Sequence, residues 1–264
     1  MSLIEVQKKG SYLEVSLARP QSRNAFNADL ISEIKETFQS VSKDPDCRVV
    51  LLKGQGESFC AGADLEYMKS MAGFSEAENK EDANQLFDMF LSIRNCALPV
   101  VTLVHGHAMG GGVGIVAASD IVIAEESTKF AFSEVKLGLV PAVISSFVLE
   151  KIIVSRAREL MLTGRVFTGV EALEIGLVGY TARGAEAEEL ALSIVNDFDR
   201  LGPEAVRETK KLLLSYDSDF HERARQTSVD VISKRRVSVE GQEGIKAFLE
   251  KRKPSWWAER GDTH

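Results

Sequence analysis

The chain has 264 residues, of which 44% are hydrophobic and 27% are charged, so it can bury one large core or a large domain plus a small one. Its formal net charge of -7 argues against nucleic acid and against an anionic membrane surface as partners. No apolar run approaches the roughly 20 residues that a membrane-spanning helix needs, so we expect no membrane span.

The cysteine usage indicates a reducing compartment. Cys47, Cys60 and Cys96 form no CxxC pair and no even-numbered framework, and disulfides belong mainly to oxidising compartments. No basic and apolar leader opens the chain, so we expect a cytoplasmic protein. No histidine and cysteine cluster has metal-site spacing, and we expect no metal.

The first part of the chain alternates strands with helices, which predicts an α/β architecture. In chain order we expect a β-hairpin over 3–17, a helix over 28–41, a strand over 48–52, a helix over 85–95, and strands over 98–104 and 121–124. The intervening stretch 68–84 is polar, holds Gly73 and several acidic residues, and is interpreted as a mobile segment beside a site.

The remaining chain is mainly helical. Helical spacing occurs over 157–162, 169–175, 187–200 and 204–214. Gly202-Pro203 is the expected hinge, which divides the chain into a core over 1–200 and a helical region over 201–264. A small charged region cannot bury its apolar face alone, so we expect it to pack on a neighbour or on its own core.

The glycine-rich stretch 109–114 follows an apolar strand and leads into an apolar helix. Glycines permit positive φ and leave backbone N-H groups uncovered, and a helix N-terminus adds partial positive charge. Such a turn can hold a phosphate or an oxygen that becomes charged during reaction. The stretch Gly54-Gln55-Gly56 lacks the third glycine and the following helix of a dinucleotide site, so we interpret it as a turn.

A second donor segment lies at 58–65, where small residues end a loop before an expected helix. Small residues also permit tight backbone approach, and that alternative stays open. Together with the glycine turn, this segment is a candidate half of an oxyanion hole, a pair of N-H groups that binds a developing negative oxygen.

Glu134 is the candidate acid or base. It lies in the mainly apolar stretch 130–141, and burial disfavours a charged carboxylate, which raises its pKa. The alternative is an ion pair with Lys136. His105 and His107 flank Gly106 before the glycine turn, and we expect them to shape that loop, because no nucleophile accompanies them.

Three motifs carry a family resemblance. Residues 59–65, 106–112 and 133–141 have the order and spacing typical of the crotonase (enoyl-CoA hydratase/isomerase) superfamily, and the likeness runs from about residue 4 to 254. The resemblance implies a crotonase-like spiral of ββα turns. It also implies a C-terminal helical region that supports homotrimers, commonly stacked as hexamers.

The resemblance also implies roles for individual residues. The N-H groups of Ala63 and Gly111 would form the oxyanion hole for an acyl-CoA thioester, with Glu134 as the catalytic residue. The CoA moiety is part of the substrate, and the resemblance implies no separate cofactor. The residues expected along CoA are Arg23, Ala25, Ala61, Asp64, Leu65 and, near the end of the chain, Lys251.

One departure from the family bears on the reaction. Typical hydratases carry a second catalytic glutamate two residues after the third glycine, where this chain has Gly114. Residues 113–114 and 133–145 resemble hydratases for branched or carboxylated substrates, such as methylglutaconyl-CoA. Hydration is therefore the first interpretation, with a single-glutamate enoyl-CoA isomerase and a non-catalytic acyl-CoA binder as alternatives.

Overall fold

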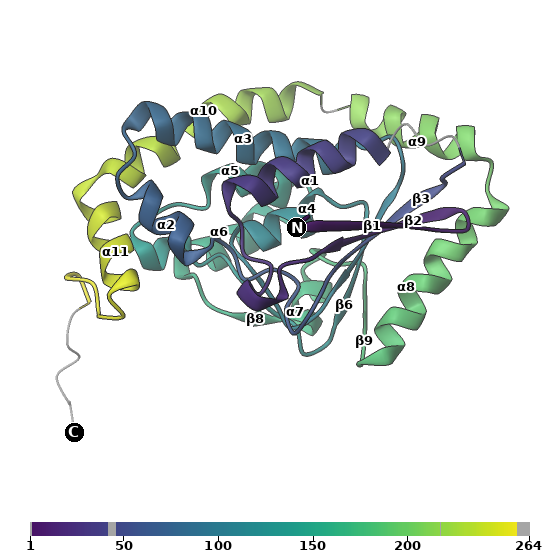
Figure 1. Cartoon of the computed structure of the whole chain (residues 1–264), viewed down its shortest axis with the longest axis horizontal. Helices are drawn as coiled ribbons and strands as arrows, with labels where there is room; N and C mark the ends of the chain where they lie inside the picture. Colours follow the sequence, from purple (N-terminus) through teal and green to yellow (C-terminus); the bar gives the residue numbers. More distant parts are fainter. Residues whose placement is uncertain (1, 42–45, 217, 258–264) are drawn as a thin grey trace.

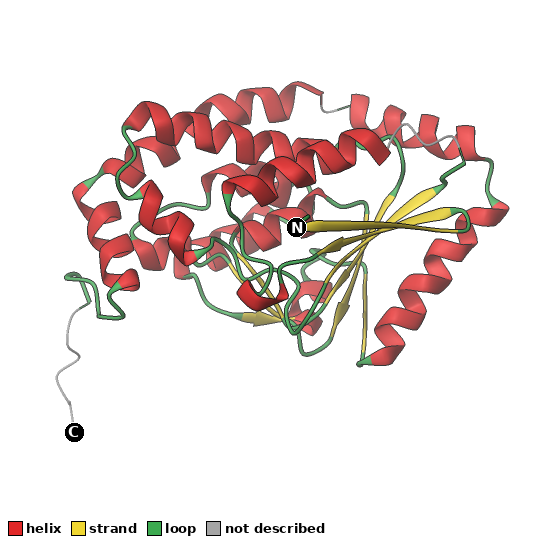
Figure 2. Ribbon diagram, in the orientation of Figure 1, coloured by secondary structure: helices red, strands yellow, loops and turns green. Residues whose placement is uncertain are grey.

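A computed structural model describes residues 2–41, 46–216 and 218–257. A six-stranded sheet runs in the order β1-β2-β3-β4-β6-β9, and a smaller sheet runs β5-β7-β8 (Figure 2). The strands are β1 (Ile4–Lys9), β2 (Tyr12–Leu17), β3 (Val49–Gly54), β4 (Val100–Val104), β5 (His107–Met109), β6 (Ile121–Glu125), β7 (Lys129–Ala131), β8 (Phe167–Thr168) and β9 (Tyr180–Ala182).

Helices cover both faces of the large sheet, as buried parallel strands require. The α-helices are α1 (Ala28–Val41), α2 (Leu65–Met71), α3 (Glu76–Arg94), α4 (Gly111–Ala118), α5 (Ala142–Leu149), α6 (Val154–Thr163), α7 (Gly169–Glu174), α8 (Ala185–Asp197), α9 (Pro203–Ser215), α10 (Ser218–Val237) and α11 (Val239–Leu249). The short 3-10 helices are η1 (Pro20–Ser22), η2 (Glu134–Leu137) and η3 (Phe198–Arg200). In Figure 1, α8 lies on one side of the sheet, and α1 and α3 lie on the other.

The predicted β-hairpin is confirmed, with β1 and β2 antiparallel and Ile4 opposite Leu17. From β2 onward the large sheet is parallel, through β3, β4, β6 and β9. The alternate side chains of β3 and β4 divide between two cores. Val50 and Leu52 face the larger one, whereas Val49 and Leu51 pack with Ala187 and other residues of α8. This division explains why the central strands are continuously apolar.

The interpretation of 68–84 as a mobile segment is wrong. Most of it forms the end of α2 and the first half of α3. Ser75 and Glu78 form a reciprocal capping box that starts α3, and the buried Asn79 side chain donates to the carbonyls of Phe74 and Ser75. These local bonds satisfy backbone groups at the helix start, and polarity alone does not reveal them.

The C-terminal helices pack on the core of their own chain. Helix α10 lies beside α3 (Figure 1), where Arg225 pairs with Asp88 at 2.6 Å. Lys210 of α9 is buried and pairs with Asp120 at 2.6 Å, just before β6. The proposed division at residue 200 stays a prediction. Among the described residues, no helix combines the length and apolarity needed to cross a membrane.

Candidate active site

The smaller sheet aligns three turns of the chain. Cys60 forms an isolated parallel bridge with Ala108 of β5, which in turn pairs with Phe130 of β7. The Cys60 N-H donates to the carbonyl of His107 at 2.9 Å, and the Met109 N-H donates to the carbonyl of Cys60 at 3.0 Å. Residues that follow Cys60, Ala108 and Phe130 by similar numbers of positions therefore meet at one edge of the sheet.

The three central predicted site residues come shortly after these paired residues in the sequence. Ala63 comes three residues after Cys60, Gly111 three after Ala108, and Glu134 four after Phe130. All three line one cavity of about 370 Å³. The structure thus brings together residues that are more than seventy positions apart in the sequence.

The two candidate donors are backbone N-H groups. Within the described part of the chain, no hydrogen-bond acceptor engages the N-H of Ala63 or of Gly111. Gly111 is the first residue of α4, where a helix leaves its N-H groups without intrahelical partners and has partial positive charge. The neighbouring N-H groups are used differently, since Gly110 donates to the carbonyl of Ala131 at 2.9 Å.

Gly110 gives Glu134 its place beside this turn. The residue has φ +49, and a Cβ there would lie 3.2 Å from Glu134 Oε1. A side chain at position 110 would be strained in that conformation and would crowd the carboxylate. The glycine turn therefore permits a close approach of an acidic side chain to the start of α4.

Glu134 has the perturbed acidity that its sequence context predicts. The residue as a whole is half-buried, but its Oε2 is enclosed and has no hydrogen-bond partner among the described residues. Burial raises the pKa of Glu134 to about 7, although its own backbone N-H donates to the carboxylate and opposes that change. Within the described chain Lys136 forms no ion pair with Glu134 and does not contribute to the shift of the Glu134 pKa, so the ion-pair alternative is not supported.

Gly114 lies where the family pattern has its second glutamate, and neighbouring side chains fill the space. A Cβ at this position would lie 2.5 Å from Phe90 Cζ and 2.7 Å from Ile144 Cγ2. Real Cβ atoms essentially never approach so closely. Of these residues, Ile144 lines the cavity, so apolar packing rather than an acidic side chain occupies this position behind it.

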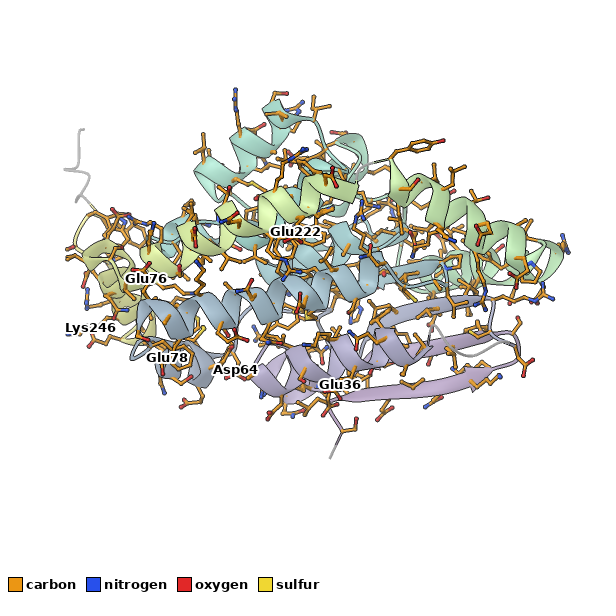
Figure 3. All side chains as sticks on the ribbon, turned by 90° about the horizontal axis from the view of Figure 1, so that it is seen from above. Glu36, Asp64, Glu76, Glu78, Glu222 and Lys246 are labelled. Carbon is orange, nitrogen blue, oxygen red and sulfur yellow. The ribbon has the colours of Figure 1, made fainter. Side chains whose placement is uncertain are left out.

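The residues expected along CoA lie at different places. Ala61 lines the cavity, and its N-H donates to the carbonyl of the exposed Arg23 at 3.0 Å. Asp64 caps α2 and pairs with Arg19 at 3.0 Å (Asp64 is labelled in Figure 3). Asp64 thus has a structural role in the protein.

Three further CoA predictions lie outside the cavity lining. Ala25 is buried, and its carbonyl accepts from the Arg19 guanidinium. Leu65 is 51% exposed, and Lys251 is exposed with φ +55. The cavity-lining cations near the end of the chain and in η2 are instead Arg252 and Lys136. Roles in CoA binding for these predicted residues stay predictions.

The histidines and cysteines considered in the sequence analysis have structural roles. His105 Nε2 lies 2.8 Å from the carbonyl oxygen of Gly56, and His107 Nδ1 lies 3.1 Å from Ser58 Oγ, which confirms that both histidines shape the loop. Cys60 is buried, which raises the pKa of its thiol to about 12 and makes it a poor nucleophile. All three cysteines are buried and form no disulfide.

A polar cluster in the same cavity was missed by the sequence reasoning. The cluster consists of Tyr67 of α2, Asp82 of α3 and Arg236 of α10, which line the cavity, and Tyr67 and Arg236 both donate to Asp82. Helix α10 is far from α2 and α3 in the sequence, and Asp82 and Arg236 look like ordinary surface charges of amphipathic helices. Only the association of α3 with α10 brings them together.

Comparison with known proteins agrees with this geometry. The family model described as enoyl-CoA hydratase/isomerase matches residues 7–259. The chain is 31% identical over 252 residues to the enoyl-CoA hydratase EchA19 of Mycobacterium tuberculosis, covering 95% of each chain. It superposes with a TM-score of 0.87 on a crystal structure of an enoyl-CoA hydratase from Mycobacterium avium, at 31% identity, covering 97% of this chain and 99% of that one.

A second solved structure gives the same result. An enoyl-CoA hydratase from Shewanella pealeana is 34% identical, with a TM-score of 0.79, covering 97% of this chain and 96% of that one. These similarities extend over nearly the whole chain, including the C-terminal helices. They confirm the predicted crotonase-like fold.

Proposed function

Because the chain belongs to the enoyl-CoA hydratase/isomerase family, we propose that it adds water across the C2-C3 double bond of an enoyl-CoA whose acyl group is branched or carboxylated. The observation that carries this proposal is the shared cavity of Glu134 with the unengaged N-H groups of Ala63 and Gly111. Such a set can polarise a thioester and move a proton beside it.

The two N-H groups would bind the thioester oxygen. As water adds to C3, the double-bond electrons move toward that oxygen and an enolate forms. Donors already in position bind the developing charge more strongly than the neutral thioester, and removing one such donor typically costs about 3 kcal/mol of transition-state stabilisation. The helix start at Gly111 adds to this stabilisation.

Glu134 would carry out both proton transfers. Its carboxylate takes a proton from water while the water oxygen bonds to C3, and the resulting carboxylic acid then gives a proton to C2. A pKa of about 7 suits both steps, because neither protonation state is strongly disfavoured near neutral pH. The proposed reaction uses no metal or redox cofactor.

Replacing Glu134 by glutamine tests this assignment. Glu134→Gln keeps the size of the side chain and removes the acid and base, so we expect the hydration rate to fall by about 10² to 10⁴ while CoA affinity stays nearly constant. Glu76→Gln is the matched control, since Glu76 is an exposed carboxylate at the start of α3 (Figure 3). Undiminished turnover by Glu134→Gln would exclude the residue from the chemistry.

The second candidate function is isomerisation of the double bond. It is favoured by Gly114, which supplies no second acidic side chain, because moving a proton between C2 and C4 needs only one acid and base. Assays with matched 2-enoyl-CoA and 3-enoyl-CoA substrates separate the two reactions. Tight CoA binding without turnover of either would instead indicate a non-catalytic acyl-CoA binder.

We also propose that the protein is a homotrimer or a dimer of trimers. Seven large apolar side chains between residues 149 and 173 are at least 39% exposed in the single chain: Leu149, Ile153, Val154, Leu162, Val166, Val170 and Leu173. Such a concentration of exposed apolar side chains is typical of a contact between protein chains. Association would remove this surface from water.

A further inference from the structure

The cavity that holds Glu134 also contains a charged cluster that the proposed reaction does not use. Asp82 accepts from the Tyr67 hydroxyl through Oδ1 and from Arg236 Nη1 through Oδ2. Arg236 Nη1 also lies 3.4 Å from Asn79 Oδ1. Both Arg236 and Asp82 are largely buried, with side-chain exposures of 11% and 9%.

Part of the Arg236 guanidinium has no acceptor. Both hydrogen bonds of this side chain use Nη1, and no described residue accepts from Nε or Nη2. These two nitrogens form one edge of the planar group, and their parallel N-H groups match the two oxygens of a carboxylate. Because the side chain lines the cavity, a carboxylate bound there can accept from this edge in place of water.

Apart from these polar groups, much of the cavity wall is apolar. The side chains that line the cavity along with Glu134 and Arg236 include Met68, Met71, Leu86, Leu139, Val143 and Ile232. An acyl chain would lie against such a wall, with its thioester at Ala63 and Gly111. The charged cluster would then meet the far end of that chain.

We propose that Arg236 selects acyl-CoA substrates that carry a carboxylate at the far end of the acyl chain. This inference rests on the proposed function for the position of the thioester. Asp82 would hold the guanidinium in place through Nη1 and leave the Nε and Nη2 edge to the substrate. Tyr67 and Asn79 would position this pair through their own hydrogen bonds.

Binding of saturated acyl-CoAs to the full-length protein tests the proposal without requiring turnover. Isothermal titration compares chains of five to eight carbons that end in a carboxylate, a hydroxyl or a methyl group. We expect the carboxylate series to bind more tightly than the methyl series by at least about tenfold at its best length. Equal affinities at every length would overturn the proposal, as would a hydroxyl series that binds as tightly as the carboxylates.

A double variant locates the effect. Asp82→Asn with Arg236→Gln removes both charges together and leaves no unpaired ion in the cavity. We expect the carboxylate-to-methyl affinity ratio to fall by about tenfold, whereas a merely structural role would weaken both series equally. An unchanged ratio in this variant contradicts the role of Arg236.

The matched control breaks another ion pair between the same two helices. Lys80 of α3 pairs with Asp230 of α10, and neither residue lines the cavity. The double variant Lys80→Gln with Asp230→Asn should keep the ratio of the unaltered protein. A separate hydration assay tests the proposed function. If the protein does not hydrate an enoyl-CoA, the carboxylate-to-methyl affinity ratio still tests the role of Arg236.

Discussion

The buried carboxylate of Glu134 links the candidate site to the stability of the fold. Its pKa is about 7 in the folded chain and near 4.5 in the unfolded chain. Between these values the unfolded state releases the proton while the folded state keeps it, so rising pH favours unfolding. Below pH 4.5 both states are protonated, and well above pH 7 both are ionised.

This difference predicts the pH dependence of the free energy of unfolding. The free energy of unfolding of the unaltered protein, measured relative to that of Glu134→Gln, should fall by up to about 3 kcal/mol between pH 4.5 and 7. Outside that range the difference between the two proteins should not change further. Urea unfolding of both proteins at each pH measures this difference, and other titrating groups cancel in it. A difference that is constant with pH would show that the folded environment does not perturb the carboxyl.

Gly114 shows how a single residue fixes the packing of a side chain that lines the cavity, Ile144. Because its Cβ position is already occupied by Phe90 and Ile144, Gly114→Ala should destabilise the fold by about 1 to 3 kcal/mol. Ile144→Ala removes one of the two obstacles, so the double variant should be less destabilised than the sum of the single variants. Additive losses in a thermal unfolding experiment would contradict this account.

At the scale of elements, glycines let α11 approach the segment that carries Glu134. A Cβ at Gly244 would lie 2.1 Å from the carbonyl oxygen of Leu137, the last residue of η2. On the other side of this contact, a Cβ at Gly138 would lie 2.7 Å from the carbonyl oxygen of Glu240 in α11. The C-terminal helix therefore supports the candidate site directly.

Gly244→Val should push α11 away from η2. We expect a lower melting temperature and a lower kcat with enoyl-CoA, because η2 begins at Glu134 and its position depends on this contact. Gly73→Ala is the control, since a Cβ there meets its nearest neighbour at an ordinary 3.6 Å. If the two variants melt and turn over alike, α11 does not support the site in this way.

The elements also show which signals the sequence carries. Continuous apolar runs correctly predicted β3, β4 and β6, because strands buried on both faces require them. The start of α3 was missed because its capping box and the buried Asn79 stabilise a polar segment that lacks a helical apolar stripe. Local hydrogen bonds, rather than hydrophobic periodicity, decide that segment.

At the scale of the whole molecule, the candidate site depends on how distant segments pair and pack. The glycine turn and the apolar context of Glu134 could be recognised in the sequence, because backbone conformation and burial are local consequences of residue type. The polar cluster of Asp82 and Arg236 could not, because it requires α3 and α10 to lie side by side. Contacts between distant helices have no local signature.

The proposed oligomer gives the last prediction. If the exposed apolar side chains of residues 149–173 form a contact between chains, light scattering should give three or six times the chain mass of 29.0 kDa. Ile153→Glu with Leu162→Glu places charges on two side chains that are 68% and 75% exposed in the single chain, so each chain should still fold. We expect the variant to shift toward monomers, because burying an unpaired charge in an interface is unfavourable.

Val6→Glu is the control for this experiment, because Val6 is 47% exposed but lies on edge strand β1, away from that stretch. It should keep the mass of the unaltered protein. A monomeric unaltered protein, or a double variant that assembles as before, would show that these side chains do not hold chains together. Since η2, which begins at Glu134, and α11, which contacts it, belong to the same chain, the monomeric variant should also retain the hydrogen bonds of the site.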